Sequence, residues 1–193
     1  MRHHWHVPLA SLVLAGVAIL GGALPALAQQ SGEPATVILG TVASDPGTTA
    51  TIPLYYKPGA ARSIRNVHLE LEFVSNSVKF AKAEKGVAAE TQNFDLAVNA
   101  KELPPDGNIQ RTRLSIDVSV ADADAGKSLP EGLWTLLDFQ VPADAKAFAI
   151  ALNPIAVTAQ DADKKPVKLM AEAGKIIVSV PDEPLAACFF FTH

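Results

Sequence analysis

The segment RTRLSIDVSV, residues 111–120, decides the fold class because apolar and polar side chains alternate along it. Its apolar side comprises Leu114, Ile116, Val118 and Val120, and its polar side comprises Arg113, Ser115, Asp117 and Ser119. Successive side chains of a β-strand point to opposite faces, so this pattern predicts a strand with one buried and one solvent-facing side. Such half-buried strands are typical of antiparallel sheets.

Two further segments, RNVHLELEF (65–73) and LWTLLDFQV (133–141), have the same period. The polar side of the first comprises Asn66, His68, Glu70 and Glu72. The apolar side of the second comprises Leu133, Thr135, Leu137, Phe139 and Val141. Trp134 then falls on the opposite side, where a large aromatic residue is either part of a secondary core or an exposed anchor for a partner.

Shorter β-type runs lie between clusters of Pro, Gly, Asp and Asn. They are TVILGTV (36–42), TATIPLYY (49–56), AFAIAL (147–152), IAVTA (155–159) and GKIIVSV (174–180). Helical signal is confined to residues 81–90, which are long enough for a turn or two, and residues 142–147, which are long enough for one turn. Many short strands separated by turn residues predict an all-β chain, folded as a single antiparallel β-sandwich.

Residues 1–28 have the pattern of a signal peptide. Arg2 gives a positive start, Val7–Leu24 is apolar, and the sequence ALA before Gln29 matches the small-residue cleavage pattern. Cleavage after Ala28 predicts a secreted protein (extracellular, cell-surface or periplasmic) with no stable membrane span once the signal is removed. The rest divides into a polar lead-in (29–35), a domain (36–180) and a tail (181–193).

The composition narrows the partners and the chemistry. The formal net charge is −4 and Lys and Arg are not clustered, which argues against nucleic acid as a partner. The single cysteine, Cys188, precludes an internal disulfide. Only His68 and His193 lie beyond the predicted signal peptide, which limits the catalytic chemistry available.

The loop VADADAGKSLPEG, residues 120–132, imitates two ligand-binding motifs. A phosphate-binding loop needs glycine at the position of Ala121 and a helix after the loop, but the chain continues toward another strand. A helix-loop-helix calcium site counted from Asp122 needs an oxygen ligand, glycine and glutamate at positions occupied by Gly126, Lys127 and Leu133. We therefore interpret the segment as a loop between strands, with a looser surface calcium site as the alternative, and expect no cofactor and no metal centre.

From residue 37 to residue 180, the order of strands and loops resembles a cohesin domain, the module of cellulosomal scaffoldins and of free-standing bacterial secreted proteins. The similar segments are VILGTVASDPGTTATIPLYY (37–56), SIRNVHLELEF (63–73), NFDLAV (93–98), DGNIQRTRLSIDVSVAD (106–122), LPEGLWTLLDFQV (129–141), IAVTAQDADKKPV (155–167) and GKIIVSV (174–180). The chain departs from the family pattern at Val74-Ser75-Asn76, where cohesins usually have Asp-Pro after the third strand.

The resemblance implies a jelly-roll sandwich of about nine strands, close in architecture to carbohydrate-binding modules. It also implies a non-catalytic role, which is to dock a dockerin module carried by another protein. Polysaccharide-degrading machinery is one class of protein that could carry such a module. Carried over by position, the docking residues are Asn66, His68, Glu70, Arg113, Ser115, Asp117, Ser119 and Asp122, with Trp134 as the potential anchor. Lys127, Ser128 and Glu131 would form the rim. The alternative for this set is an ordinary solvated strand face.

Three other functions remain open. Direct polysaccharide binding would use exposed aromatic rings, for which the candidates are Tyr55, Tyr56 and Trp134, although adjacent tyrosines in a strand cannot both face outward. A structural or adhesive envelope protein is the second alternative. Catalysis by Glu70 and Glu72, roughly 6.6 Å apart on one strand face, is disfavoured because an open face provides no cleft to raise the pKa of either carboxyl.

The tail VPDEPLAACFFFTH has two interpretations, a truncated sorting segment or an unstructured end. In either case, Cys188 is expected to be a free thiol that is available for pairing with another chain.

Overall fold

The structure is a computed structural model that describes residues 33–59, 63–92, 94–121, 126–180 and 186–187. These residues form twelve strands and one short helix. In chain order they are β1 (Ala35–Leu39), β2 (Thr41–Ser44), β3 (Thr49–Lys57), β4 (Asn66–Val74), β5 (Lys79–Lys85), α1 (Val87–Gln92), β6 (Phe94–Glu102), β7 (Arg111–Val120), β8 (Gly132–Gln140), β9 (Phe148–Gln160), β10 (Leu169–Glu172), β11 (Gly174–Val178) and β12 (Ala186–Ala187).

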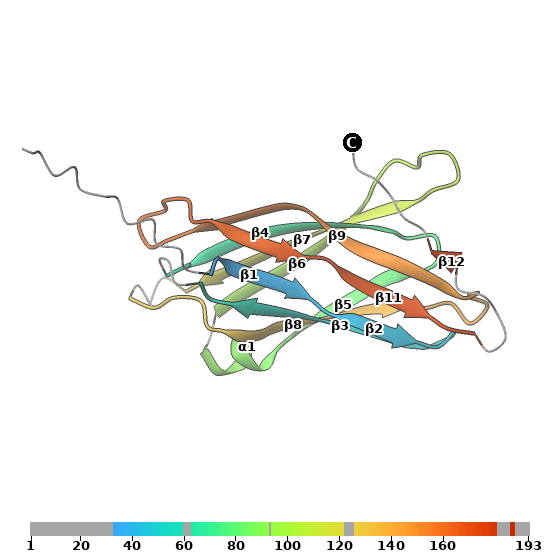
Figure 1. The fold of residues 1–193 in the computed structure, drawn as a ribbon, viewed down its shortest axis with the longest axis horizontal. Helices are drawn as coiled ribbons and strands as arrows, with labels where there is room; N and C mark the ends of the chain where they lie inside the picture. Colours follow the sequence, from blue (N-terminus) through green and yellow to red (C-terminus); the bar gives the residue numbers. More distant parts are fainter. Residues whose placement is uncertain (1–32, 60–62, 93, 122–125, 181–185, 188–193) are drawn as a thin grey trace, which may run out of the picture.

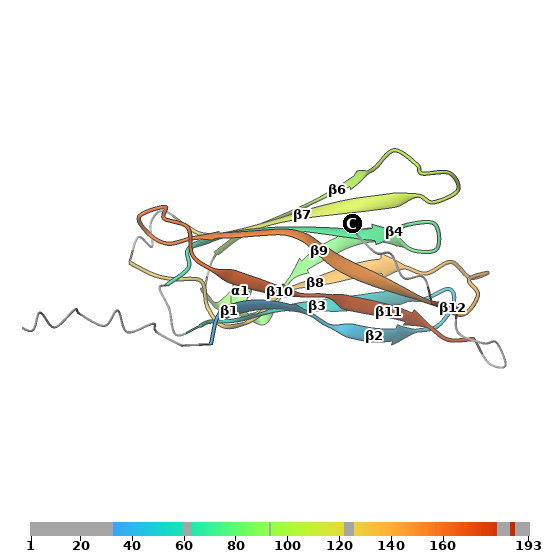
Figure 2. The same cartoon turned by 45° about the horizontal axis from the view of Figure 1, so that its top comes forward.

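The strands form two curled sheets that lie face to face (Figures 1 and 2). The first sheet has the order β10-β1-β3-β8-β5, and the second has the order β2-β11-β9-β4-β7-β6, with β12 beside β9. Neighbouring strands are antiparallel except in the pairs β1–β10, β2–β11 and β9–β12, which are parallel. The predicted all-β jelly-roll sandwich is confirmed, with mixed rather than purely antiparallel sheets.

The first and last strands of the jelly roll each change sheets part-way along. The predicted run 36–42 breaks at Gly40 into β1 and β2, and its counterpart breaks between β10 and β11. The breaks lie side by side, since the Lys175 amide donates to the Gly40 carbonyl at 3.2 Å. A Cβ on Gly174 would lie 2.4 Å from that same carbonyl oxygen, so the crossing needs glycine there. If β1 with β2 and β10 with β11 are each counted as one strand, β1–β11 give nine strands, the number that the resemblance implied.

The core lies between the sheets and contains the apolar sides that the alternation predicts. In β4 the buried residues are Val67, Leu69, Leu71 and Phe73, and in β7 they are Leu114, Ile116, Val118 and Val120. The facing sheet contributes the inward residues of β3 and β8, among them Ile52, Leu54, Leu137 and Phe139. Each fully buried aliphatic side chain stabilises the fold by about 1.5–3 kcal/mol. This shared core fixes which side of β4 and β7 faces solvent.

Several local expectations were wrong. Residues 81–85 belong to strand β5 rather than to a helix, and α1 begins only at Val87. Residues 142–147 form a turn in which the Ala145 amide donates to the Pro142 carbonyl. The two runs 147–152 and 155–159 are one strand, β9, whose pairing with β4 shifts register next to Pro154. Proline cannot donate to a strand ladder, so the irregularity accommodates it without ending the strand.

The predicted signal peptide and cleavage site lie outside the described residues, as does the tail except for Ala186–Ala187. No helix in the described part of the chain is long and apolar enough to cross a membrane.

Candidate functional site

The outward surface of the second sheet is polar across four neighbouring strands, β9, β4, β7 and β6. Strand register arranges its side chains in four rows, which we call the polar face. From one end to the other, the rows are Gln160–Asn66–Ser119–Asp95, Thr158–His68–Asp117–Ala97, Ala156–Glu70–Ser115–Asn99 and Asn153–Glu72–Arg113–Lys101. The whole face is a consequence of the alternation, because each of these strands turns its apolar residues to the core.

A connected set of charged groups runs along the middle of the polar face. His68 Nδ1 lies 2.7 Å from Asp117 Oδ1, and His68 Nε2 lies 3.8 Å from Glu70 Oε1. A carboxylate only accepts, so Nδ1 of the imidazole carries the hydrogen in this bond. Arg113 then bridges two acids, with Nη1 at 3.6 Å from Glu70 and Nη2 at 3.5 Å from Glu72.

This network orients its members rather than adding much stability. The side chain of His68 is 40% exposed and that of Asp117 is 55% exposed, and exposed ion pairs contribute about 0–1 kcal/mol each. Neighbouring charges nevertheless restrict one another, because a rotation of His68 would break contacts with Asp117 and Glu70 together. The face thus presents charged groups of both signs next to one another.

A shallow depression marks one end of the polar face. It has a volume of about 300 Å³ and is lined on three strands by Asn66, His68, Asp117, Ser119, Thr158 and Gln160. The side chains of Asn66 and Ser119 form no hydrogen bond with other described residues, so their donors and acceptors are available to a partner.

The structure brings seven of the residues that the sequence singled out onto this one face: Asn66, His68, Glu70, Arg113, Ser115, Asp117 and Ser119. The rim residues Lys127, Ser128 and Glu131 are exposed in the connection between β7 and β8. Asp122 lies outside the described residues, and so does the segment that could form a looser calcium site. The described residues contain no group of three His, Cys, Asp or Glu side chains placed to hold a metal ion.

Sequence reasoning named no residue of the two outer strands of the face. Strand β6 contributes Asp95, Ala97, Asn99 and Lys101, and β9 contributes Thr158 and Gln160. The alternation in FDLAVNAK was visible in the sequence and would have identified the β6 residues. The β9 residues had no such signal, because IAVTAQ alternates only weakly and the register depends on the irregularity beside Pro154.

Trp134 is not an exposed anchor, and its inclusion among the partner-binding residues was wrong. Its side chain is fully buried, stacks on Tyr56 with ring centroids 4.5 Å apart, and donates from Nε1 to the Pro130 carbonyl at 2.8 Å. The reason is a β-bulge: Leu54 pairs with Thr135 and Tyr55 with Leu133, which leaves Trp134 as the extra residue in β8. The bulge reverses the alternation and turns the indole into the core.

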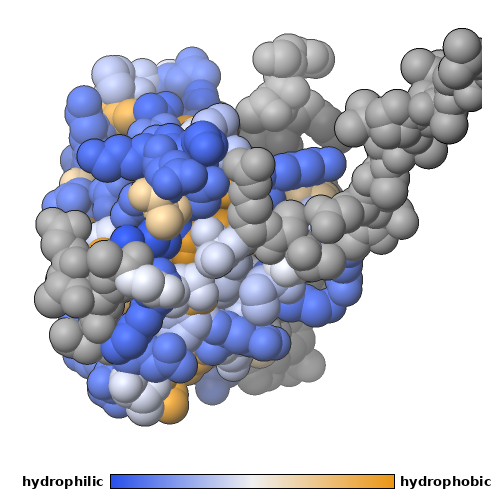
Figure 3. Space-filling model, turned by 90° about the vertical axis from the view of Figure 1, so that its left-hand side faces the viewer, coloured by the Kyte–Doolittle hydropathy of each residue, from blue (hydrophilic) through white to orange (hydrophobic). Residues whose placement is uncertain are grey.

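The aromatic platform considered for polysaccharide binding is therefore not formed. Tyr56 is buried against Trp134, and burial raises the pKa of its hydroxyl, with the nearby Glu131 carboxylate adding to the effect. Only Tyr55 of the three candidates is exposed, on the outer side of the first sheet. Figure 3 views one end of the sandwich, where hydrophilic residues predominate and the hydrophobic ones are scattered.

Solved structures similar to this one are cohesins. CaCohA2 of Clostridium acetobutylicum, in a complex with CaDoc0917, superposes with a TM-score of 0.61 at 20% identity, over 75% of this chain and 99% of the other. A non-cellulosomal cohesin from the archaeon Archaeoglobus fulgidus matches with a TM-score of 0.54 at 18% identity, over 78% and 94%. A type I cohesin–dockerin complex from Clostridium thermocellum matches with a TM-score of 0.57 at 15% identity, over 76% and 100%.

No family model matches the sequence, and neither does any curated protein. At identities of 20% or below, these structural matches show a shared fold. They cover nearly the whole length of each cohesin. The strand order in the two sheets, which comes from the described residues, is independent of these matches. The resemblance noted in the sequence is confirmed at this level: the chain has the cohesin fold.

Proposed function

We propose that this protein is a non-catalytic docking module whose polar face binds a dockerin-type module of another protein. The observation that supports it best is the polar face itself, where the His68–Asp117 pair sits among groups of both signs on four adjacent strands. Two of the three cohesin structures named above are complexes with such partners. We infer the same kind of partner for this chain.

The dimensions of the polar face suit a protein partner. Four strands at about 4.8 Å spacing and seven residues at about 3.3 Å rise give roughly 19 by 23 Å. The exposed rim residues extend this area toward the ~800 Å² that each partner buries in a standard interface. An open surface of this kind suits protein recognition better than catalysis on a small substrate, which needs a deep, water-excluding site.

The charge arrangement gives the docking its selectivity. His68, Asp117 and Arg113 offer a donor, an acceptor and a cation in a fixed order, so a partner must present the complementary order. Mismatched like charges across an interface cost several kcal/mol, whereas matched ones mainly raise the association rate. We therefore expect a restricted set of dockerin-type partners rather than general adhesion.

The test is a comparison of two ligand classes with one protein preparation. The purified protein is incubated with a panel of immobilised dockerin-type modules and, in parallel, with insoluble cellulose and chitin. Retention by at least one module and release from the polysaccharides supports the proposal. Retention on a polysaccharide that is lost in Tyr55→Ala, together with no retention on any module, would replace docking with direct glycan binding through the exposed tyrosine.

Export through a signal peptide cleaved after Ala28 is part of the proposal and is supported by the sequence pattern of residues 1–28. Mass spectrometry of the protein recovered outside the cytoplasm should find Gln29 as the first residue. An unprocessed N-terminus in the membrane fraction would contradict this part and leave the docking test unaffected.

A further inference from the structure

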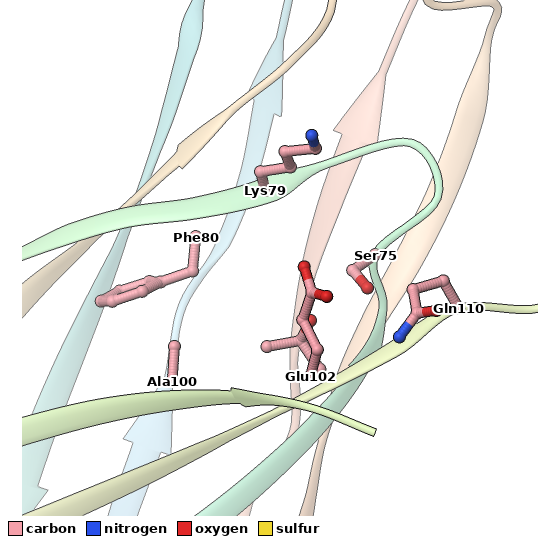
Figure 4. Close-up of a pocket in the computed structure, with 7 residues that line it drawn as sticks. Ser75, Lys79, Phe80, Ala100, Glu102 and Gln110 are labelled. Carbon is pink, nitrogen blue, oxygen red and sulfur yellow. The ribbon is translucent and has the colours of Figure 1, made fainter. Parts of the chain in front are cut away.

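A hollow of about 440 Å³ opens between β5 and β6, the edge strands of the two sheets. Figure 4 shows the residues that line it, which include Ser75, Lys79, Phe80, Ala100, Glu102 and Gln110. None of them belongs to the polar face, because β6 turns its odd-numbered residues there and its even-numbered ones between the sheets. The hollow is therefore a separate site from the proposed docking surface.

The inner side of β6 explains why a hollow forms here. Along that side, Leu96 and Val98 pack against the core, but Ala100 and Glu102 follow and are exposed. A small residue and a charged one cannot fill the space between two sheets. The β6–β7 hairpin accordingly rises away from the first sheet in Figure 2.

Three polar groups that line this space keep hydrogen-bonding capacity that no described residue uses. The Glu102 carboxylate makes no hydrogen bond or ion pair with any described residue. The Ser75 hydroxyl is buried and likewise unpaired. Gln110 donates from Nε2 to the carbonyls of Leu103 and Arg111, at 2.7 and 3.2 Å, so its side-chain oxygen remains able to accept. The Ser75 hydroxyl is the informative group, because a buried polar group without a partner is costly and uncommon in folded proteins, whereas the Glu102 side chain is exposed.

The positions of these groups depend on the stretch where the sequence departs from the cohesin pattern. The Ser75 amide donates to the Gln110 carbonyl at 2.8 Å, and the Gln110 amide donates to Asn76 Oδ1 at 2.7 Å. Asn76 also donates from Nδ2 to the Asn108 carbonyl at 2.9 Å. Ser75-Asn76 thus fixes the hairpin of β6 and β7 beside the end of β4 and places a hydroxyl in the hollow.

The lining has two chemically different sides. The Glu102 carboxylate and the Ser75 hydroxyl lie on one side, whereas Phe80 and Ala100 supply an apolar wall (Figure 4). The amino group of Lys79 points away from Glu102, to the other side of β5 (Figure 4), so it does not neutralise the carboxylate. A ligand that fits must donate several hydrogen bonds along one edge and present C–H groups on the other.

We propose that the hollow binds a single sugar ring. A pyranose carries vicinal hydroxyls that can donate to the Glu102 carboxylate and pair with the Ser75 hydroxyl, and an apolar C–H face for Phe80. The volume lies within the ~300–1,000 Å³ range of small-ligand sites. An ammonium ligand fits less well, because one carboxylate beside a single aromatic ring does not make a cation cage.

The test uses the purified protein, labelled with ¹⁵N, and titration with glucose, galactose and N-acetylglucosamine. At least one sugar should shift the amide signals of residues 75–80 and 100–112 while leaving those of residues 66–69 in place. Glu102→Gln keeps the shape and removes the charge, and it should weaken binding at least tenfold, while the matched change Glu90→Gln on α1 should have no effect.

Ser75→Ala separates recognition from folding. Removal of an unpaired buried hydroxyl should leave the melting temperature unchanged or higher, yet weaken sugar binding severalfold. If Ser75→Ala does not fold, the Glu102→Gln result decides alone. No shift with any of the three sugars, or shifts that Glu102→Gln leaves unchanged, would overturn the proposal. Neither result bears on docking, which uses the other surface.

Discussion

Replacement of Trp134 by alanine should destabilise the protein by about 4–5 kcal/mol. The indole is fully buried, stacks on Tyr56 and lies edge-on to Phe94 with ring centroids 6.0 Å apart. Truncation of a buried tryptophan to alanine costs about 3–5 kcal/mol. The hydrogen bond to the Pro130 carbonyl is lost as well, which places the estimate in the upper half of that range. Such a loss is a large fraction of the ~5–15 kcal/mol that stabilises a typical domain.

Trp134→Phe divides this loss into its parts. Phenylalanine keeps most of the apolar burial and the ring contact with Tyr56, but leaves the buried Pro130 carbonyl without its donor. We expect a loss of about 1–3 kcal/mol, the cost of an unpaired buried acceptor. Tyr55→Ala is the control, because it removes an exposed aromatic from the same region at a cost of about 1 kcal/mol or less.

Urea unfolding followed by far-ultraviolet circular dichroism gives the three free energies by linear extrapolation. The order of loss should be Trp134→Ala, then Trp134→Phe, then Tyr55→Ala. A Trp134→Ala variant within 1 kcal/mol of the wild type would refute the bulge and the buried indole. It would restore Trp134 as a surface residue and with it the aromatic-anchor hypothesis.

Three further outcomes follow from the structure. Gly40→Ala should cost about 1–3 kcal/mol in urea unfolding, because its Cβ would lie 2.7 Å from the proline ring of β3; a neutral change would contradict the tight crossing. In Tyr55→Phe, where Tyr56 is the single remaining tyrosine, spectrophotometric titration should give a pKa above 10.0. Since burial raises the pKa of Tyr56 in the folded state, the unfolded state loses this proton first, and stability should fall as pH rises above about 10. A Tyr56 pKa that is not raised would contradict the burial of this hydroxyl. Thr51→Val removes the 2.7 Å hydrogen bond to the largely buried Asp138 carboxylate and should lower the free energy of unfolding by about 1–2 kcal/mol. An unchanged free energy of unfolding would show that water replaces this hydrogen bond.

Strand alternation predicted the faces of β4 and β7 because these two strands pair with each other over nine residues without a shift in register. The facing sheet buries one side of each strand, so apolar residues mark the buried side and polar residues mark the solvent-facing side. The same rule failed at Trp134, where a single extra residue reverses the alternation. A second irregularity between Phe80 and Lys82 in β5 likewise obscured the strand pattern and allowed residues 81–85 to resemble a helix. Bulges depend on pairing with a neighbour, which one strand's sequence does not contain.

The candidate site was predictable in part for the same reason. Residues of β4 and β7 reach the polar face through alternation alone, whereas β6 and β9 join it only through the order of strands in the sheet. The His68–Asp117 contact needs the register of two strands 49 positions apart along the chain. The hollow beside Glu102 was not predictable, because it arises where two sheet edges diverge and the serine that lines it reads as an ordinary loop residue.

Isothermal titration with a dockerin-type module retained by the protein tests the central claim most directly. We expect one-to-one binding that is weakened at least tenfold by His68→Ala with Asp117→Ala. Thr49→Ala with Gln140→Ala should leave the affinity unchanged, because that pair shares an exposed 2.9 Å hydrogen bond on the other sheet. Equal affinities for both double variants, with unfolding free energies near that of the wild type, would contradict docking through the polar face.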